Sequence, residues 1–191
     1  MAALIEVRLT ELAQLFNSMD PSPFHERDLD HDAEEFIVSW AQEHARGEDL
    51  KLVVHLTRPP ADGPPDPQLV ENSVQHYFSY RAELLWREFR QLMKEGRLSL
   101  LVGLGFLVLC QAGIWLLHLP ATGASQPVHE WGLPGLSVQL RAFLREGLTI
   151  VGWVAMWRPL EIYLYRWWPL LGRRRLYQRL ASMVVEVRLP A

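Results

Sequence analysis

The stretch LSLLVGLGFLVLCQAGIWLLHL, from Leu98 to Leu119, decides the architecture of this 191-residue chain. It contains no Asp, Glu, Lys or Arg. At a rise of about 1.5 Å per residue, a helix of this length is about 33 Å long, which matches a hydrocarbon core of about 30 Å. The stretch therefore predicts a first transmembrane helix. The alternative is the buried helix of a soluble protein.

A second apolar segment, residues 147–166, predicts a second span. It is less apolar than the first, because Arg158, Pro159 and Glu161 fall in its C-terminal half. Aromatic side chains of the kind that gather at membrane interfaces surround it, namely Trp153, Trp157, Tyr163, Tyr165, Trp167 and Trp168. We expect a transmembrane hairpin, with residues 120–146 forming an extracytoplasmic loop and an amphipathic lead-in to the second helix.

The basic residues predict the orientation of this hairpin. Five precede the first span and five follow the second, against Arg141 and Arg145 between the spans; the ten are Arg81, Arg87, Arg90, Lys94, Arg97, Arg166, Arg173, Arg174, Arg175 and Arg179. The positive-inside rule places both termini in the cytoplasm. Residues 1–97 hold 18 acidic and 10 basic residues, net −8. An acidic soluble part is a poor nucleic-acid binder, so we expect no nucleic-acid partner.

The chain before the first span predicts a small α+β domain, residues 1–66. Leu4–Leu9 alternates apolar and charged residues, which is typical of a half-buried strand, and Leu50–Leu56 reads as a second strand. Between them, Asp32 with Glu35 forms a capping box for a helix that we expect to reach about Arg46. Five prolines in residues 57–67 predict a stiff, extended connector.

One long helix is predicted over residues 67–119, with Asp66 as its cap and Pro67 at its first position. A heptad seam follows it into the first span: Phe78, Ala82, Leu85, Phe89, Leu92, Gly96, Ser99 and Gly103. The small residues Gly96, Ser99 and Gly103 allow another backbone to approach closely. The seam either packs on the chain's own sheet or contacts a helix of another subunit, which would make the protein a homo-oligomer.

The C-terminal tail, residues 167–191, ends in a strand that resembles the first one. Val185-Glu186-Val187-Arg188-Leu189 nearly repeats Ile5-Glu6-Val7-Arg8-Leu9. Antiparallel pairing would place Glu6 opposite Arg188 and Arg8 opposite Glu186, two favourable cross-strand pairs. The predicted fold is an α+β membrane protein in which both termini contribute to a small mixed sheet in the cytoplasm.

Arg158 and Glu161 are the most conspicuous candidate functional pair. They lie three residues apart on a predicted helix, within reach of an ion pair, and charge at membrane depth is costly. The pair either lines a transport pathway or anchors the helix at the interface. The acidic and histidine residues near Asp30 lack the spacing of a calcium loop, so we expect no metal site, no cofactor and no catalytic residues.

Two segments, PSPFHERDLDHDAEEFIVSWA at 21–41 and GWVAMWRPLEIYLYRWWPL at 152–170, resemble small uncharacterised two-span proteins of bacterial inner membranes. The resemblance implies a bacterial inner-membrane location and no particular activity. The expected function is that of a non-enzymatic scaffold or accessory subunit that self-associates in the lipid bilayer. The alternative is an oligomeric channel or transporter lined by Arg158 and Glu161.

Overall fold

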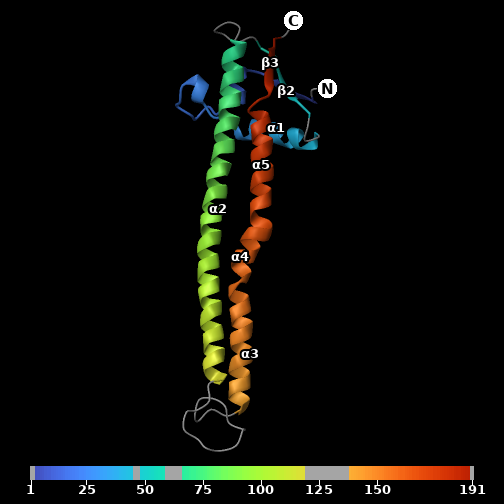
Figure 1. Cartoon of the computed structure of the whole chain (residues 1–191). Coiled ribbons are helices and arrows are strands. Elements are labelled where there is room, and N and C mark those ends of the chain that lie inside the picture. Colours follow the sequence, from blue (N-terminus) through green and yellow to red (C-terminus); the bar gives the residue numbers. More distant parts are fainter. Residues whose placement is uncertain (1–2, 45–47, 59–65, 119–137, 190–191) are drawn as a thin grey trace, which may run out of the picture. The chain divides into compact units, whose positions relative to one another are not determined.

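The computed structural model describes residues 3–44, 48–58, 66–118 and 138–189 of the chain (Figure 1). Its elements are β1 Ala3–Leu9, α1 His31–Glu43, β2 Leu50–Leu56, α2 Pro67–His118, α3 Val138–Ala155, α4 Trp157–Glu161, the π-helical η3 Ile162–Arg166, α5 Trp167–Leu180 and β3 Val184–Arg188, with short 3-10 turns Leu12–Leu15 and Phe24–Glu26. The chain forms two compact units. Unit 1 is Met1–Glu88 with Pro169–Ala191, and unit 2 is Phe89–Trp168.

The three strands form one small sheet in the order β1, β2, β3, and both neighbouring pairs are parallel. Ile5 pairs with Leu52, and Leu52 pairs with Val185. Strands from near both ends of the chain do share a sheet, as predicted, but the sheet is parallel rather than mixed. The apolar β2 takes the central position, and helices connect successive strands, which is the usual requirement of parallel pairing.

The predicted antiparallel pairing of the terminal strands is wrong, because β2 separates β1 from β3. Glu6 therefore does not lie directly opposite Arg188, nor does Arg8 lie opposite Glu186. Glu186 instead pairs with Lys51 of β2 at 2.6 Å and with Arg188 of its own strand at 2.8 Å. Glu6 lies 3.9 Å from His55 Nε2. These charged side chains line the outer face of the sheet.

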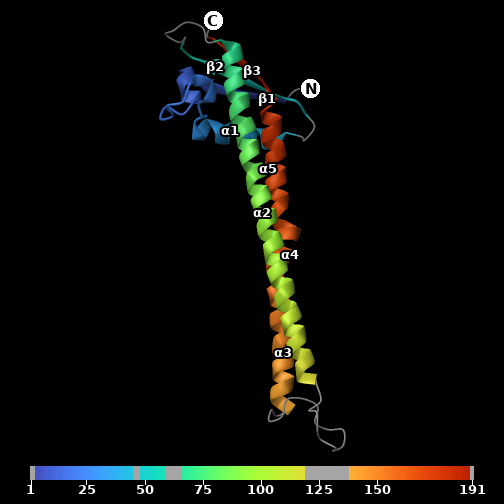
Figure 2. The ribbon, with the colours of Figure 1, turned by 60° about the vertical axis from the view of Figure 1, so that its left-hand side comes forward.

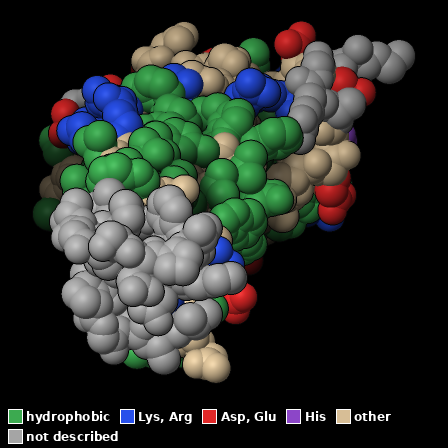
Figure 3. Space-filling model, turned by 60° about the horizontal axis from the view of Figure 1, so that its bottom comes forward, with side chains coloured by type: hydrophobic (Ala, Val, Ile, Leu, Met, Phe, Trp, Pro, Cys, Tyr) green, Lys and Arg blue, Asp and Glu red, His purple; other side chains and the backbone are tan. Residues whose placement is uncertain are grey.

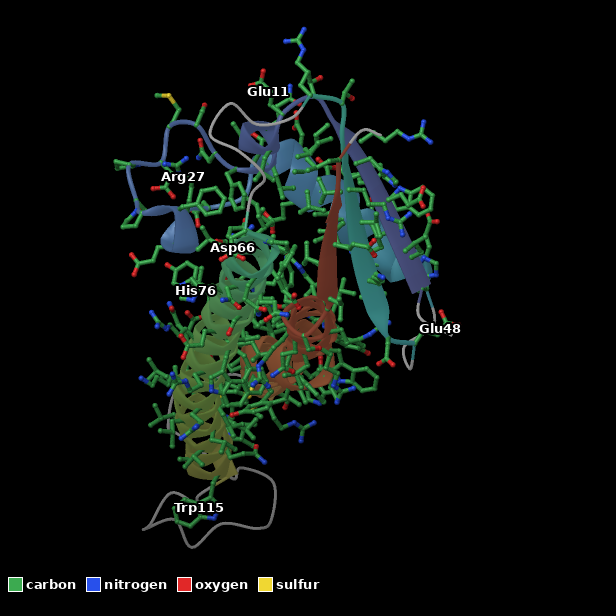
Figure 4. All side chains as sticks on the ribbon, turned by 90° about the horizontal axis from the view of Figure 1, so that it is seen from above. Glu11, Arg27, Glu48, Asp66, His76 and Trp115 are labelled. Carbon is green, nitrogen blue, oxygen red and sulfur yellow. The ribbon has the colours of Figure 1, made fainter. Side chains whose placement is uncertain are left out.

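The opposite face of the sheet packs against helices and forms the hydrophobic core of unit 1. Ile5, Leu52 and Val185 of the three strands belong to this core. The helices contribute fully buried side chains to it, including Ile37 of α1, Val74 and Phe78 of α2, and Leu180 of α5. In Figure 4 the strands lie to one side of α2 and α5, with Asp66 at the start of α2. Segments that precede and follow unit 2 in the sequence thus fold together.

The helix boundaries agree with the sequence prediction at α2 and differ at α1. Asp66 Oδ1 accepts a hydrogen bond from the backbone N–H of Gln68 at 3.0 Å, and α2 continues without a break to His118. At α1 the cap is Asp30, whose carboxylate accepts from the N–H of Asp32 at 3.1 Å. The helix also ends at Glu43, short of Arg46. The proline-rich connector and the loop at 120–134 lie largely or wholly outside the described residues.

Only one helix among the described residues is long and apolar enough to cross a membrane, within Pro67–Trp115. The predicted second span does not form one such helix. α3 carries Arg141, Arg145 and Glu146, and the helical run breaks at Met156, where a turn precedes α4. Pro159 explains the break, since it has no N–H to donate to the carbonyl of Ala155.

Candidate functional site

Glu34 is a buried carboxylate that joins three helices of unit 1. Its side chain is 7% exposed, on the inner face of α1 beside Ile37 and Ala41. The hydroxyl groups of Tyr77 and Tyr177 donate to it at 2.7 and 2.8 Å, one from α2 and the other from α5. The Arg81 guanidinium donates to both carboxylate oxygens, at 2.9 to 3.1 Å. Every donor comes from a helix other than α1.

The Glu34 cluster stabilises the charged form of its carboxylate. Burial alone raises the pKa of Glu34, but the hydrogen bonds from Tyr77, Tyr177 and Arg81 together hold that pKa below its ordinary value. The pKa values of both tyrosines are raised, first by burial and then by the neighbouring carboxylate. The tyrosines therefore stay protonated and act as hydrogen-bond donors. This arrangement locks helices together and presents no group poised for acid or base chemistry.

Sequence reasoning missed the Glu34 cluster. Spacing gave one signal: Glu34 precedes the core residues Ile37 and Ala41 by three and seven positions, so it shares their face of the helix. Phe36 and Trp40 also recur at helical spacing beside Ile37 and Ala41, yet both are exposed. Nothing local in the sequence identifies Tyr177 as a partner, because it lies 143 residues away.

In unit 2, the second half of α2 packs antiparallel against α3, α4 and η3, and glycines mark the contact. A Cβ placed on Gly113 would lie 3.5 Å from Leu148, and one on Gly152 would lie 3.2 Å from Leu107. At Gly103 the nearest atom would be the carbonyl oxygen of Ala155, at 3.0 Å. The contact pairs run in opposite directions along the chain, which defines a helical hairpin with small residues inside.

The outer surface of the hairpin is apolar. In the most hydrophobic part of α2, only 11% of the residues are buried. Leu101, for example, is 69% exposed. Trp153 on α3 is 67% exposed. Figure 3 shows hydrophobic side chains covering much of the described surface on one face of the molecule, with Lys and Arg toward its margin. Monomeric water-soluble proteins keep exposed apolar patches small, and larger ones mark surfaces that contact other proteins or lipid.

The heptad seam is covered by the chain itself. Phe78 and Leu85 belong to the core of unit 1, and Leu92 is also buried. In unit 2, a Cβ on Gly96 would lie 3.0 Å from Ile162. Phe89 and Ser99 are half-buried. Of the two alternatives left by the sequence, the structure has packing within the chain along much of the seam. A contact between subunits at the half-buried Phe89 and Ser99 stays a prediction.

Arg158 and Glu161 form the predicted ion pair, with 3.3 Å between Arg158 Nη1 and Glu161 Oε2. Their side chains are 56% and 40% exposed. Between them in the sequence, Pro159 is buried and faces Gly103. The charged side chains thus point away from the hairpin interior, while the proline packs into it.

No protein-family model, curated protein or solved structure matches the chain. Among the described residues, no group of three or more His, Cys, Asp and Glu side chains is placed to hold a metal ion.

Proposed function

We propose that this chain is a non-enzymatic integral membrane protein, a scaffold or accessory subunit whose helical hairpin anchors a small α+β domain at the cytoplasmic face of a bacterial inner membrane. The observation that carries the proposal is the apolar outer surface of the hairpin combined with the sheet that unites β2 and β3.

The parallel pairing of β2 with β3 supports an even number of membrane crossings. β2 precedes the apolar helix and β3 follows it, yet their residues Leu52 and Val185 are register partners in one sheet. Both strands must lie on the same side of any membrane. If α2 crosses the bilayer once, the chain must cross back before β3.

The hairpin supplies the return path. The segment from Leu148 to Ile162 packs along α2 from Gly113 to Gly96, so it lies at the same depth as the apolar stretch. Taken alone, this segment does not form one continuous apolar helix of spanning length, because the helix breaks at Met156. The small residues inside and large apolar residues outside are the pattern expected of helices that pack together within lipid.

The Arg158 and Glu161 pair favours the anchoring role over a transport pathway. Two helices packed through glycines enclose no channel, and the pair lies on the outside of the hairpin, among aromatic residues of the kind found at interfaces. A channel would require several copies with these pairs facing a shared pore. Self-association stays a prediction.

Membrane fractionation of the full-length protein tests the proposal. We expect it in the membrane pellet after carbonate and urea washes, and soluble only with detergent. Native mass determination in a mild detergent then measures copy number. A protein that is monodisperse in buffer without detergent would contradict the membrane assignment, whereas a detergent-solubilised monomer would contradict self-association alone.

A further inference from the structure

A cavity of about 520 Å³ lies between the C-terminal end of α1 and α5, within unit 1. Its walls include the apolar side chains of Ala41 and Leu176, and His44 from the end of α1. Cavities of this volume hold small organic ligands. Its lining includes neither Glu34 nor any of the three donors to Glu34, although the lining residue Arg173 interacts with the hydroxyl of Tyr177.

The described lining of this cavity carries three arginines, Arg173, Arg175 and Arg179, and no carboxylate. Arg179 is held in place, because its Nη2 donates to the backbone carbonyl of Glu48 at 2.8 Å. Arg175 makes no hydrogen bond or ion pair with any described residue. The nearby carboxylate of Glu48 lies 3.8 Å from His44 Nδ1. The described lining of the cavity therefore combines three cationic side chains with no anionic one.

The neighbouring Arg174 belongs to a different surface. Its guanidinium stacks over the ring of Trp86 at 4.5 Å from the centroid, and Arg174 does not line the cavity. The three consecutive arginines of α5 are thus divided: Arg173 and Arg175 line the cavity and Arg174 packs against α2. Helical periodicity produces this division, and it makes Arg174 a control for the charge of the cavity arginines.

The chemistry of the cavity fits a phosphate group attached to an apolar body. Planar guanidinium groups bind phosphate oxygens in pairs, and Ala41 and Leu176 offer apolar contact. The cavity's first α5 residue, Pro169, directly follows Trp167 and Trp168 in the sequence, a pair typical of a membrane interface. Basic clusters next to a span attract anionic lipids.

We propose that this cavity binds the phosphate of an anionic lipid headgroup through Arg173, Arg175 and Arg179. The inference rests on the proposed membrane location. It gives the cytoplasmic domain a second attachment to the bilayer, independent of the hairpin. The same chemistry would accept a soluble phosphate compound, so the experiment compares the two sources.

The test uses the full-length protein, first inserted into bilayer discs and then released into a neutral detergent for native mass spectrometry. The discs contain phosphatidylcholine with or without phosphatidylglycerol. We expect phosphatidylglycerol to remain bound after release and phosphatidylcholine to be lost. Arg175→Gln should lower retained phosphatidylglycerol roughly fivefold, and Arg173→Gln should have a comparable effect.

The matched control is Arg174→Gln, which removes the same charge one residue away and leaves the cavity lining intact. It should change retention by less than about twofold. An equal loss of phosphatidylglycerol in all three variants would mean that general surface charge, and not the cavity, retains the lipid. That result would overturn the proposal. Displacement of phosphatidylglycerol by millimolar inorganic phosphate would overturn the lipid source. Failure to enter the discs would instead refute the membrane location itself.

Discussion

The hydroxyl group of Tyr177 donates a hydrogen bond to Glu34 Oε1 at 2.8 Å across 143 positions of the chain. Glu34 precedes the apolar helix and Tyr177 follows the hairpin. Their contact shows that the two segments flanking unit 2 form one folded body. The same relationship appears in the sheet, where β3 adds to β2. Unit 1 can therefore finish folding only after the chain has been synthesised through unit 2 and α5.

Removing the Glu34 carboxylate should destabilise unit 1 strongly. Glu34→Ala leaves the buried Tyr77 and Tyr177 hydroxyls without their acceptor, and leaves Arg81 without its counter-ion. Breaking a buried charged pair typically costs about 3–5 kcal/mol, and the partial exposure of Arg81 favours the lower end. Thermal unfolding of the detergent-solubilised protein measures the effect. Glu35→Ala, an exposed neighbour, is the control and should stay within about 0.5 kcal/mol of the wild type.

The contribution of Glu34 should depend on pH. Because its folded-state pKa is lowered from the ordinary 4.5, its stabilisation is present above that value and is lost as pH falls through the folded pKa. The stability difference between the wild type and Glu34→Gln should therefore shrink as pH falls below about 4.5. Paired unfolding curves at several pH values measure it. A stability difference between the two proteins that grew toward acid pH would show that the folded-state pKa of Glu34 is raised and not lowered.

The hairpin interior should reject a side chain at Gly103. A Cβ there would lie 3.0 Å from the carbonyl oxygen of Ala155, a backbone atom that cannot turn aside. Gly103→Ala should therefore lower the melting temperature of the detergent-solubilised protein by a few degrees, for a cost of about 1–3 kcal/mol.

Gly105 provides the matched control for this substitution. A Cβ at Gly105 meets nothing within 4 Å, on the same helix and two residues away. Gly105→Ala should be neutral or stabilising by up to about 1 kcal/mol, since alanine is the better helix former. Equal melting temperatures for the two variants would mean that α2 and its antiparallel partner do not pack as described.

Arg158 and Glu161 should prove dispensable for ion movement. In the proposed anchoring role, Arg158→Ala and Glu161→Ala each alter the depth or stability of the helix and leave liposome ion flux at the background of empty vesicles. The two single effects on stability should add in the double variant to within about 1 kcal/mol, because an exposed ion pair is worth about 1 kcal/mol or less. Flux through the wild type that either substitution abolished would favour the channel instead.

Local patterns predicted the elements that depend on near neighbours. The alternation of Leu4–Leu9, the apolar run of β2 and the cap at Asp66 each identify an element from a few adjacent residues, and the structure has all three. The cap of α1 was predicted two residues late, because Asp30 and Asp32 are equally good caps by type.

Relationships between distant segments were much less predictable. The near-identical terminal strands suggested that β1 and β3 pair with each other, but charge complementarity of exposed residues is weak beside the burial of Leu52 and Val54 on a central strand. The Glu34 cluster needs side chains from three helices to converge, and no local pattern encodes that. The division of α5 arginines between a cavity and Trp86 likewise appears only in three dimensions.

Cysteine accessibility tests most directly the central proposal, that the hairpin crosses the membrane twice. The chain has a single cysteine, Cys110, so a Cys110→Ala background allows single reporters at Ser39, Ser125 and Ser182. In intact bacterial spheroplasts, a membrane-impermeant maleimide should label Ser125→Cys. It should label Ser39→Cys and Ser182→Cys only after permeabilisation. Labelling of Ser39→Cys and Ser182→Cys from opposite sides of the membrane would contradict the account.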